Sequence, residues 1–136
     1  MSKTINFLVA LKHEALPIID YFELTLSNKK YRNIYSNAEK NVFLIISGIG
    51  IQNAKKAVTK LKQLNYNKDD IWVNIGIAGH EKFKVGSIYE VKKVISNNNE
   101  NTFFTNSFYN EVPTGTICCV NEEEKEYNNK YLYDME

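Results

Sequence analysis

The stretch Val42-Phe-Leu-Ile-Ile-Ser-Gly-Ile-Gly50 decides the fold, because it joins a continuous apolar run to a tight glycine turn. Such a run is typical of a strand that is covered on both faces. Beyond the turn, apolar residues recur at the spacing of one helix face. They are Ile51, Ala54, Val58, Leu61 and Leu64. The sequence therefore predicts a strand, a glycine turn and a helix in direct succession.

The preceding segment predicts a second strand and helix. Residues 5–11 are rich in large apolar side chains, and residues 13–24 place apolar side chains near helical spacing. We expect this helix to begin between Lys12 and Ala15, with Pro17 in its first turn, where proline is tolerated. Residues 31–37 and 41–47 are two strand candidates separated by three residues, so they predict an antiparallel pair.

The segment after residue 70 predicts further strands. Residues 71–79 read as a buried strand that runs into a glycine loop, and residues 85–95 alternate as a strand or a pair of strands. We expect loops at residues 96–101, short strands at 116–120 and 131–135, and a solvated loop or helix at 122–130.

These elements predict an α/β fold with a mixed, largely parallel central sheet flanked by helices. A chain of 136 residues fits one domain, so we expect a single domain over residues 1–136. Ligands of such sheets bind beyond the carboxyl ends of the strands.

The charge balance indicates a small-molecule partner. The formal net charge is +1 with 24% charged residues, which lacks the basic excess of a nucleic-acid-binding protein. Arg32 is the single arginine, so several guanidinium groups cannot act together on a phosphate.

The cysteines and the apolar runs predict a cytoplasmic protein. Cys118 and Cys119 are neighbours, and neighbouring side chains of a strand point to opposite faces, so they cannot readily pair. No apolar run approaches about 18 residues, so we expect no membrane partner. His13 and His80 lack ligand partners at helical spacing, and we expect neither a metal ion nor a cofactor.

Three predicted strand ends carry candidate site groups: Glu14, the turn around Ile49, and the loop Ile77-Ala78-Gly79. Glycines let the backbone approach a ligand closely and expose amide donors. The alternative for the glycines is that they only form tight turns. The alternative for Glu14 is a structural one, since a carboxylate in the first turn is favoured by the helix dipole.

Taken in order, these segments resemble the nucleoside phosphorylase and nucleosidase superfamily, most closely the methylthioadenosine/adenosylhomocysteine nucleosidases. The resemblance lies in Ile5-Asn-Phe-Leu-Val-Ala-Leu-Lys-His-Glu14, Ser47-Gly-Ile-Gly50, Asn74-Ile-Gly-Ile-Ala-Gly79, Val85-Gly-Ser-Ile-Tyr-Glu-Val91 and Asp134-Met-Glu136. It implies a protein that binds a purine nucleoside, with methylthioadenosine as one candidate.

The resemblance also implies roles for individual residues. Glu14 would hold or deprotonate the attacking water, and Ile49 with Ile77, Ala78 and Gly79 would line the nucleoside site. Met135 would pack under the ribose, and Glu136 would accept hydrogen bonds from the ribose hydroxyls.

The chain resembles a shortened member of that family. The family takes its leaving-group acid from an Asp beyond the Met-Glu motif, so we expect the C-terminal catalytic segment to be lacking here. The segment between Ser96 and Asp134 is also shorter than usual, Ile77 replaces a small polar residue, and His80 stands where glycine is usual.

Three functions follow from the resemblance. The first is hydrolysis of the N-glycosidic bond of a ribosyl or methylthioribosyl purine, and the second is nucleoside binding without catalysis. The third is phosphorolysis, with phosphate held by backbone amides and lysines. Family members are commonly dimers, so the resemblance is also compatible with a homodimer.

Overall fold

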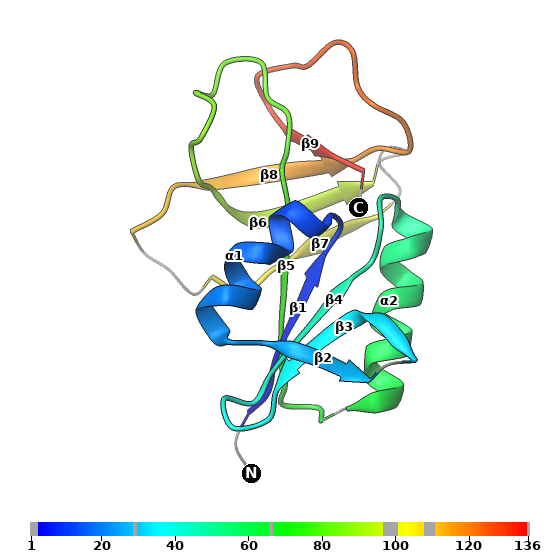
Figure 1. Cartoon of the computed structure of the whole chain (residues 1–136). Coiled ribbons are helices and arrows are strands. Elements are labelled where there is room, and N and C mark those ends of the chain that lie inside the picture. The colour runs from blue at the N-terminus through cyan, green and yellow to red at the C-terminus, as the bar shows by residue number, and fades with distance from the viewer. Residues whose placement is uncertain (1–2, 29, 66, 97–100, 108–110, 136) are drawn as a thin grey trace. The chain divides into compact units, whose positions relative to one another are not determined.

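The computed structural model describes residues 3–28, 30–65, 67–96, 101–107 and 111–135 (Figure 1). The chain divides between Gly76 and Ile77 into two compact units, and each unit contains one mixed sheet. The predicted α/β fold, with parallel and antiparallel strands and flanking helices, is confirmed, and its strands are distributed over two sheets. A single domain over residues 1–136 stays a prediction.

The first unit contains a five-stranded sheet in the order β2-β3-β4-β1-β5. Its strands are β1 (Ile5–Val9), β2 (Thr25–Asn28), β3 (Tyr31–Asn37), β4 (Val42–Ile46) and β5 (Ile71–Ile75). β1 pairs in parallel with both β4 and β5, whereas β3 pairs antiparallel with β2 and β4. The predicted β3–β4 hairpin is therefore confirmed.

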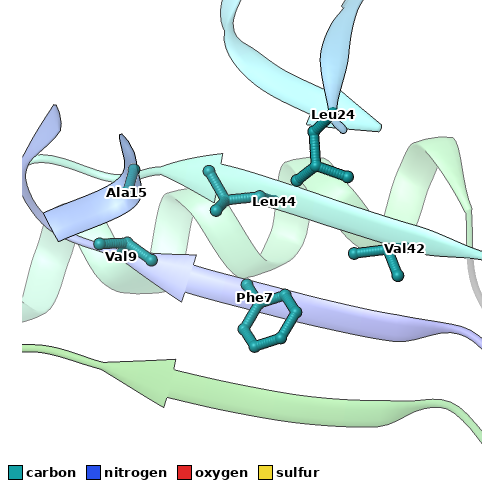
Figure 2. Packing of buried hydrophobic residues seen from close by; sticks show 6 residues of the cluster. All are labelled: Phe7, Val9, Ala15, Leu24, Val42 and Leu44. Carbon is teal, nitrogen blue, oxygen red and sulfur yellow. The ribbon is translucent and has the colours of Figure 1, made fainter. Parts of the chain in front are cut away.

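Helix α1 (Lys12–Phe22) covers one face of this sheet. Phe7 and Val9 of β1 pack with Val42 and Leu44 of β4, and Ala15 of α1 and Leu24 close the cluster (Figure 2). Deleting a buried leucine side chain from such a cluster costs about 2–5 kcal/mol. This cluster therefore fixes α1 on the sheet.

Helix α2 (Ile51–Leu64) covers the opposite face. Ile34 and Ile45 pack with Ala57 and Leu61 of α2, and Leu8 of β1 joins them. Because Leu8 alternates with Phe7 and Val9 along β1, the two helices lie on opposite sides of the sheet (Figure 1). The predicted strand, turn and helix unit at residues 42–64 is confirmed.

Two details at α1 differ from expectation. The helix begins at Lys12 as predicted, but Pro17 falls in its second turn, so the prediction of a first-turn proline is wrong. β1 also ends at Val9 rather than Leu11, because the N–H group of Leu11 is bonded to the Glu14 side chain and not to a strand. Pro17 lacks the backbone N–H group that would donate a helix hydrogen bond. Burial of Ala15 and the packing of α1 against the sheet compensate for this loss.

The second unit contains a four-stranded sheet in the order β7-β6-β8-β9. Its strands are β6 (Glu90–Ser96), β7 (Thr102–Phe104), β8 (Thr114–Cys119) and β9 (Leu132–Asp134). β6, β8 and β9 run parallel, and β7 is antiparallel to β6. The predicted strand at 85–95 is shorter than expected, residues 122–130 form turns and bends, and the predicted loop at 96–101 lies mostly outside the described residues.

Both cysteines are buried in β8 and form no disulfide, as the sequence predicts. Cys118 packs with Val120 and Tyr133 in the core of the second unit. Burial raises the pKa of the Cys118 thiol, and the negative charges of Asp134 and Glu124 raise it further. The thiol is therefore protonated and unreactive at neutral pH.

We predict that the raised pKa of Cys118 makes the fold less stable in alkali. Above the ordinary thiol pKa of about 8.5, the unfolded chain loses this proton while the folded chain retains it, so stability falls as pH rises. Urea unfolding at several pH values between neutrality and alkali measures the effect. The Cys118→Ala variant should show a smaller decline, and an equal decline would contradict this prediction.

Asn6 of β1 is fully buried, and its side-chain amide has no hydrogen-bond partner among the described residues. It pairs with Phe43 of β4 and Trp72 of β5 in the sheet register. A buried amide without a partner costs about 1–3 kcal/mol. Asn6 is therefore a local cost to the stability of the first unit.

We predict that Asn6→Leu, which is similar in size, raises the free energy of unfolding by about 1–2 kcal/mol. Urea unfolding followed by circular dichroism measures this change. Asn33→Leu is the matched control, because the Asn33 amide donates to the Ile46 carbonyl at 2.9 Å and accepts from Lys60 at 3.2 Å. The control should lose stability, and an equal loss in Asn6→Leu would contradict this prediction.

Candidate functional site

The carboxyl ends of β1 and β4 meet at one edge of the first unit. The N–H group of Ser47 donates to the carbonyl of Val9 at 2.8 Å, and that of Gly48 donates to the carbonyl of Ala10 at 3.0 Å. The glycine turn after β4 is therefore bonded directly to the segment that leaves β1. Ligands of α/β sheets bind at this kind of edge.

Glu14 lies at the same edge, in the first turn of α1. Its Oε2 atom accepts a hydrogen bond of 3.0 Å from the N–H group of Leu11. This is half of a capping box, because Leu11 has no side-chain oxygen to return a bond to the helix. The contact fixes the carboxylate at the start of α1, where the helix dipole favours negative charge. Glu14 therefore stabilises the start of α1, which is the structural role that the sequence analysis gave as the alternative to catalysis.

The turn that carries Ile49 is held in a fixed conformation. Gly48 and Gly50 have φ angles of 83° and 106°, which side chains rarely adopt. The Asn53 side chain donates to the Ile49 carbonyl at 2.7 Å. The Ile49 side chain remains 47% exposed. The turn therefore presents an apolar side chain beside the edge that carries Glu14.

The loop Ile77-Ala78-Gly79 belongs to the second unit. Gly79 exchanges two backbone hydrogen bonds with Tyr133 of β9, at 2.8 and 2.9 Å. A β-carbon at Gly79 would lie 2.5 Å from the Tyr127 ring. The ring therefore rests directly on the backbone of Gly79. Ile77 is exposed.

Met135 follows β9 and packs against the cluster of Cys118, Val120 and Tyr133. The N–H group of Val120 donates to the carbonyl of Asp134 at 2.7 Å, which fixes the backbone just before Met135. Glu136 lies outside the described residues. Met135 is thus anchored in the second unit, close in the chain to the Gly79–Tyr133 bridge.

The candidate residues fall into two sets. Glu14 and Ile49 share one edge of the first unit, whereas Gly79 and Met135 are both linked to β9 of the second unit. Sequence reasoning did not identify Asn53, which fixes the turn, or Tyr127, whose ring rests on Gly79. Neither role has a sequence signal, because each depends on a contact that only the fold creates.

The described residues contain no group of three or more His, Cys, Asp or Glu side chains that could hold a metal ion. No described helix is long and apolar enough to cross a membrane. The candidate groups at the edge of the first unit are the Glu14 carboxylate, the backbone of the glycine turn and the Ile49 side chain.

The chain is similar to several solved structures of methylthioadenosine nucleosidases. The Arabidopsis thaliana 5′-methylthioadenosine nucleosidase matches with a TM-score of 0.83 and 17% identity, over 98% of this chain and 72% of that one. A nucleosidase variant from Chlamydia trachomatis matches with a TM-score of 0.80 and 19% identity, over 99% of this chain and 70% of that one.

The same Chlamydia trachomatis nucleosidase variant bound to methylthioadenosine also matches, with a TM-score of 0.75 and 18% identity, over 98% of this chain and 70% of that one. No family model and no curated protein matches the sequence. The chain therefore has the nucleoside phosphorylase and nucleosidase fold, as the sequence motifs predict, and it spans about 70% of these nucleosidases.

We predict that Gly79→Ala destabilises the second unit by about 1–3 kcal/mol, because the added methyl group displaces the Tyr127 ring. Urea unfolding measures this cost. The double variant Gly79→Ala/Tyr127→Ala should cost less than the sum of the two single variants, since removing the ring removes the overlap. Strictly additive costs would contradict direct contact between these residues.

Proposed function

We propose that this protein is a hydrolytic purine nucleosidase that cleaves the N-glycosidic bond of a ribosyl or methylthioribosyl purine. The observation that supports it most is the coincidence of fold and site. The chain is similar in structure to methylthioadenosine nucleosidases, and Glu14 lies at the carboxyl edge of β1 and β4, which also carries the glycine turn.

The same comparison supports recognition of a purine. The Chlamydia trachomatis nucleosidase has been solved with methylthioadenosine and with adenine. In the proposal, Ile49 and the loop Ile77-Ala78-Gly79 line the nucleoside site, and Met135 packs under the ribose. Glu136 accepts hydrogen bonds from the ribose hydroxyls.

Glu14 is the proposed general base. Water attacks the anomeric carbon, its proton passes to the Glu14 carboxylate, and the bonding electrons leave with the purine, which takes up a proton from solvent water. The sugar passes through an oxocarbenium-like state that a nearby carboxylate stabilises. The hydrogen bond from Leu11 holds the carboxylate in place for this step.

Two other functions use the same residues. A nucleoside-binding protein without catalysis would need the recognition groups and not the base. A phosphorylase would need phosphate as the nucleophile, and Arg32 is the single arginine that could contribute to holding it. Water is therefore the favoured nucleophile of this proposal.

We predict that the protein releases adenine from methylthioadenosine without phosphate, and that Glu14→Gln lowers turnover about 10²- to 10⁴-fold. Gln keeps an oxygen that can accept the Leu11 N–H group, so folding should be retained. Glu39→Gln is the control, because Glu39 lies in the exposed turn between β3 and β4. Adenine is measured by chromatography, with and without phosphate.

Calorimetric titration with methylthioadenosine accompanies the assay. Binding without adenine release would favour the non-catalytic protein, and release that requires phosphate would favour the phosphorylase. Absence of both binding and release would contradict the proposal.

The cytoplasmic location and the homodimer also remain part of this proposal. Sedimentation equilibrium distinguishes a dimer from a monomer, and cell fractionation locates the protein.

A further inference from the structure

A cleft of about 290 Å³ lies within the second unit, where β8 and β9 begin. Thr114, Gly115 and Thr116 of β8 and Leu132 of β9 line it. These residues lie at the amino ends of parallel strands, whereas Met135 follows the carboxyl end of β9. The cleft and Met135 therefore lie at opposite ends of β9. Its volume is close to the lower end of the ~300–1,000 Å³ of small-ligand sites.

Two lysines, Lys92 and Lys130, also line the cleft, and no carboxylate is among its lining residues. In the part of the chain that the structure describes, neither ammonium group has an ion-pair or hydrogen-bond partner. Two like charges facing one small volume repel each other unless an anion enters. The charge of the cleft therefore favours an anionic ligand.

The position of Lys92 is set by an irregularity in the sheet. Val91 pairs with Gly115, and the next pair is Lys93 with Thr116, so Lys92 is an extra residue in β6. Bulges of this kind redirect a side chain and are common beside functional sites. The Lys92 carbonyl accepts the N–H group of Thr105 at 3.1 Å, which ties the bulge to the residue after β7.

His80 adds a defined donor to the lining. Its Nδ1 atom accepts the N–H groups of Lys82 at 3.0 Å and Phe83 at 3.2 Å. In the neutral ring the proton is then on Nε2, which is the ring atom left to donate to a ligand. Together with the hydroxyl groups of Thr114 and Thr116, the cleft offers five side chains that can donate hydrogen bonds. A tetrahedral oxyanion uses so many donors better than a carboxylate does.

Two apolar side chains, Phe83 and Leu132, also line the cleft. The Phe83 ring stacks on His80 at 3.5 Å between centroids, and Tyr89 stacks on the opposite face of Phe83 at 4.3 Å. This stack holds Phe83 in one orientation, and Leu132 is buried beside the cleft. A ligand that fills the cleft therefore has an apolar or flat part next to its anionic group.

We propose that this cleft binds a small phosphate monoester that carries a ring or an apolar group. Lys92, Lys130 and His80 hold the phosphate with the two threonine hydroxyls, and Phe83 and Leu132 contact the remainder of the ligand.

The test is calorimetric titration of the full chain with phenyl phosphate, and then with inorganic phosphate, in about 0.15 M sodium chloride. We expect phenyl phosphate to bind more tightly than inorganic phosphate. Lys92→Gln and Lys130→Gln should each weaken binding of both by about tenfold or more, because each removes a charge-assisted hydrogen bond. Phe83→Leu should weaken the binding of phenyl phosphate more than the binding of inorganic phosphate.

Lys125→Gln is the matched control, because Lys125 precedes Lys130 in the same loop and does not line the cleft. It should leave the affinity unchanged. The proposal is overturned if wild type fails to bind phenyl phosphate, if neither lysine variant weakens binding, or if the control weakens it equally. Because no nucleoside is present, this result is independent of whether the protein releases adenine.

Discussion

The parallel pairing of β1 with β4 is the interaction on which the first unit depends. β1 also pairs with β5, so its backbone is bonded on both sides, and its alternating side chains hold one helix on each face. The carbonyls just beyond its end then fix the glycine turn after β4. Glu14 and Ile49 are brought to one edge because two short connections leave this same strand pair. Stability and site geometry therefore share one set of backbone hydrogen bonds.

The elements that the sequence predicts well are those with a long, unbroken hydrophobic pattern. Residues 42–64 combine a fully apolar strand, two glycines and a helix stripe, and each of these local signals agrees with the others. β2 and β7 were missed because they are short edge strands, and edge strands need not alternate apolar and polar residues. Pro17 was misplaced because tertiary packing retains the helix around it. No local pattern encodes such packing, and none distinguishes one sheet from two.

The candidate site shows the same division. Glu14 can be identified because it lies in the first turn of a predicted helix. The two glycine segments can be identified because each follows a predicted strand, and both features are local. The hydrogen bond from Asn53, the Tyr127 ring on Gly79 and the two lysines that line the cleft depend on which segments become neighbours. The cleft also depends on the β-bulge at Lys92, which arises only when β6 pairs with β8. Sequence patterns therefore identify candidate residues at a single strand end. Only the folded structure shows which residues from several segments come together in one site.

The bulge at Lys92 has a consequence for how this protein could diverge. The pairs after it, from Lys93 with Thr116 to Ser96 with Cys119, are regular. Loss of the single codon for Lys92 would therefore leave those pairs facing the same way and would close the bulge into an ordinary ladder. The sheet does not need this residue in order to pair. Because Lys93 follows directly, the shortened strand would still carry one lysine after Val91, so one genetic step could remove the bulge and halve the charge of this segment while keeping the same fold.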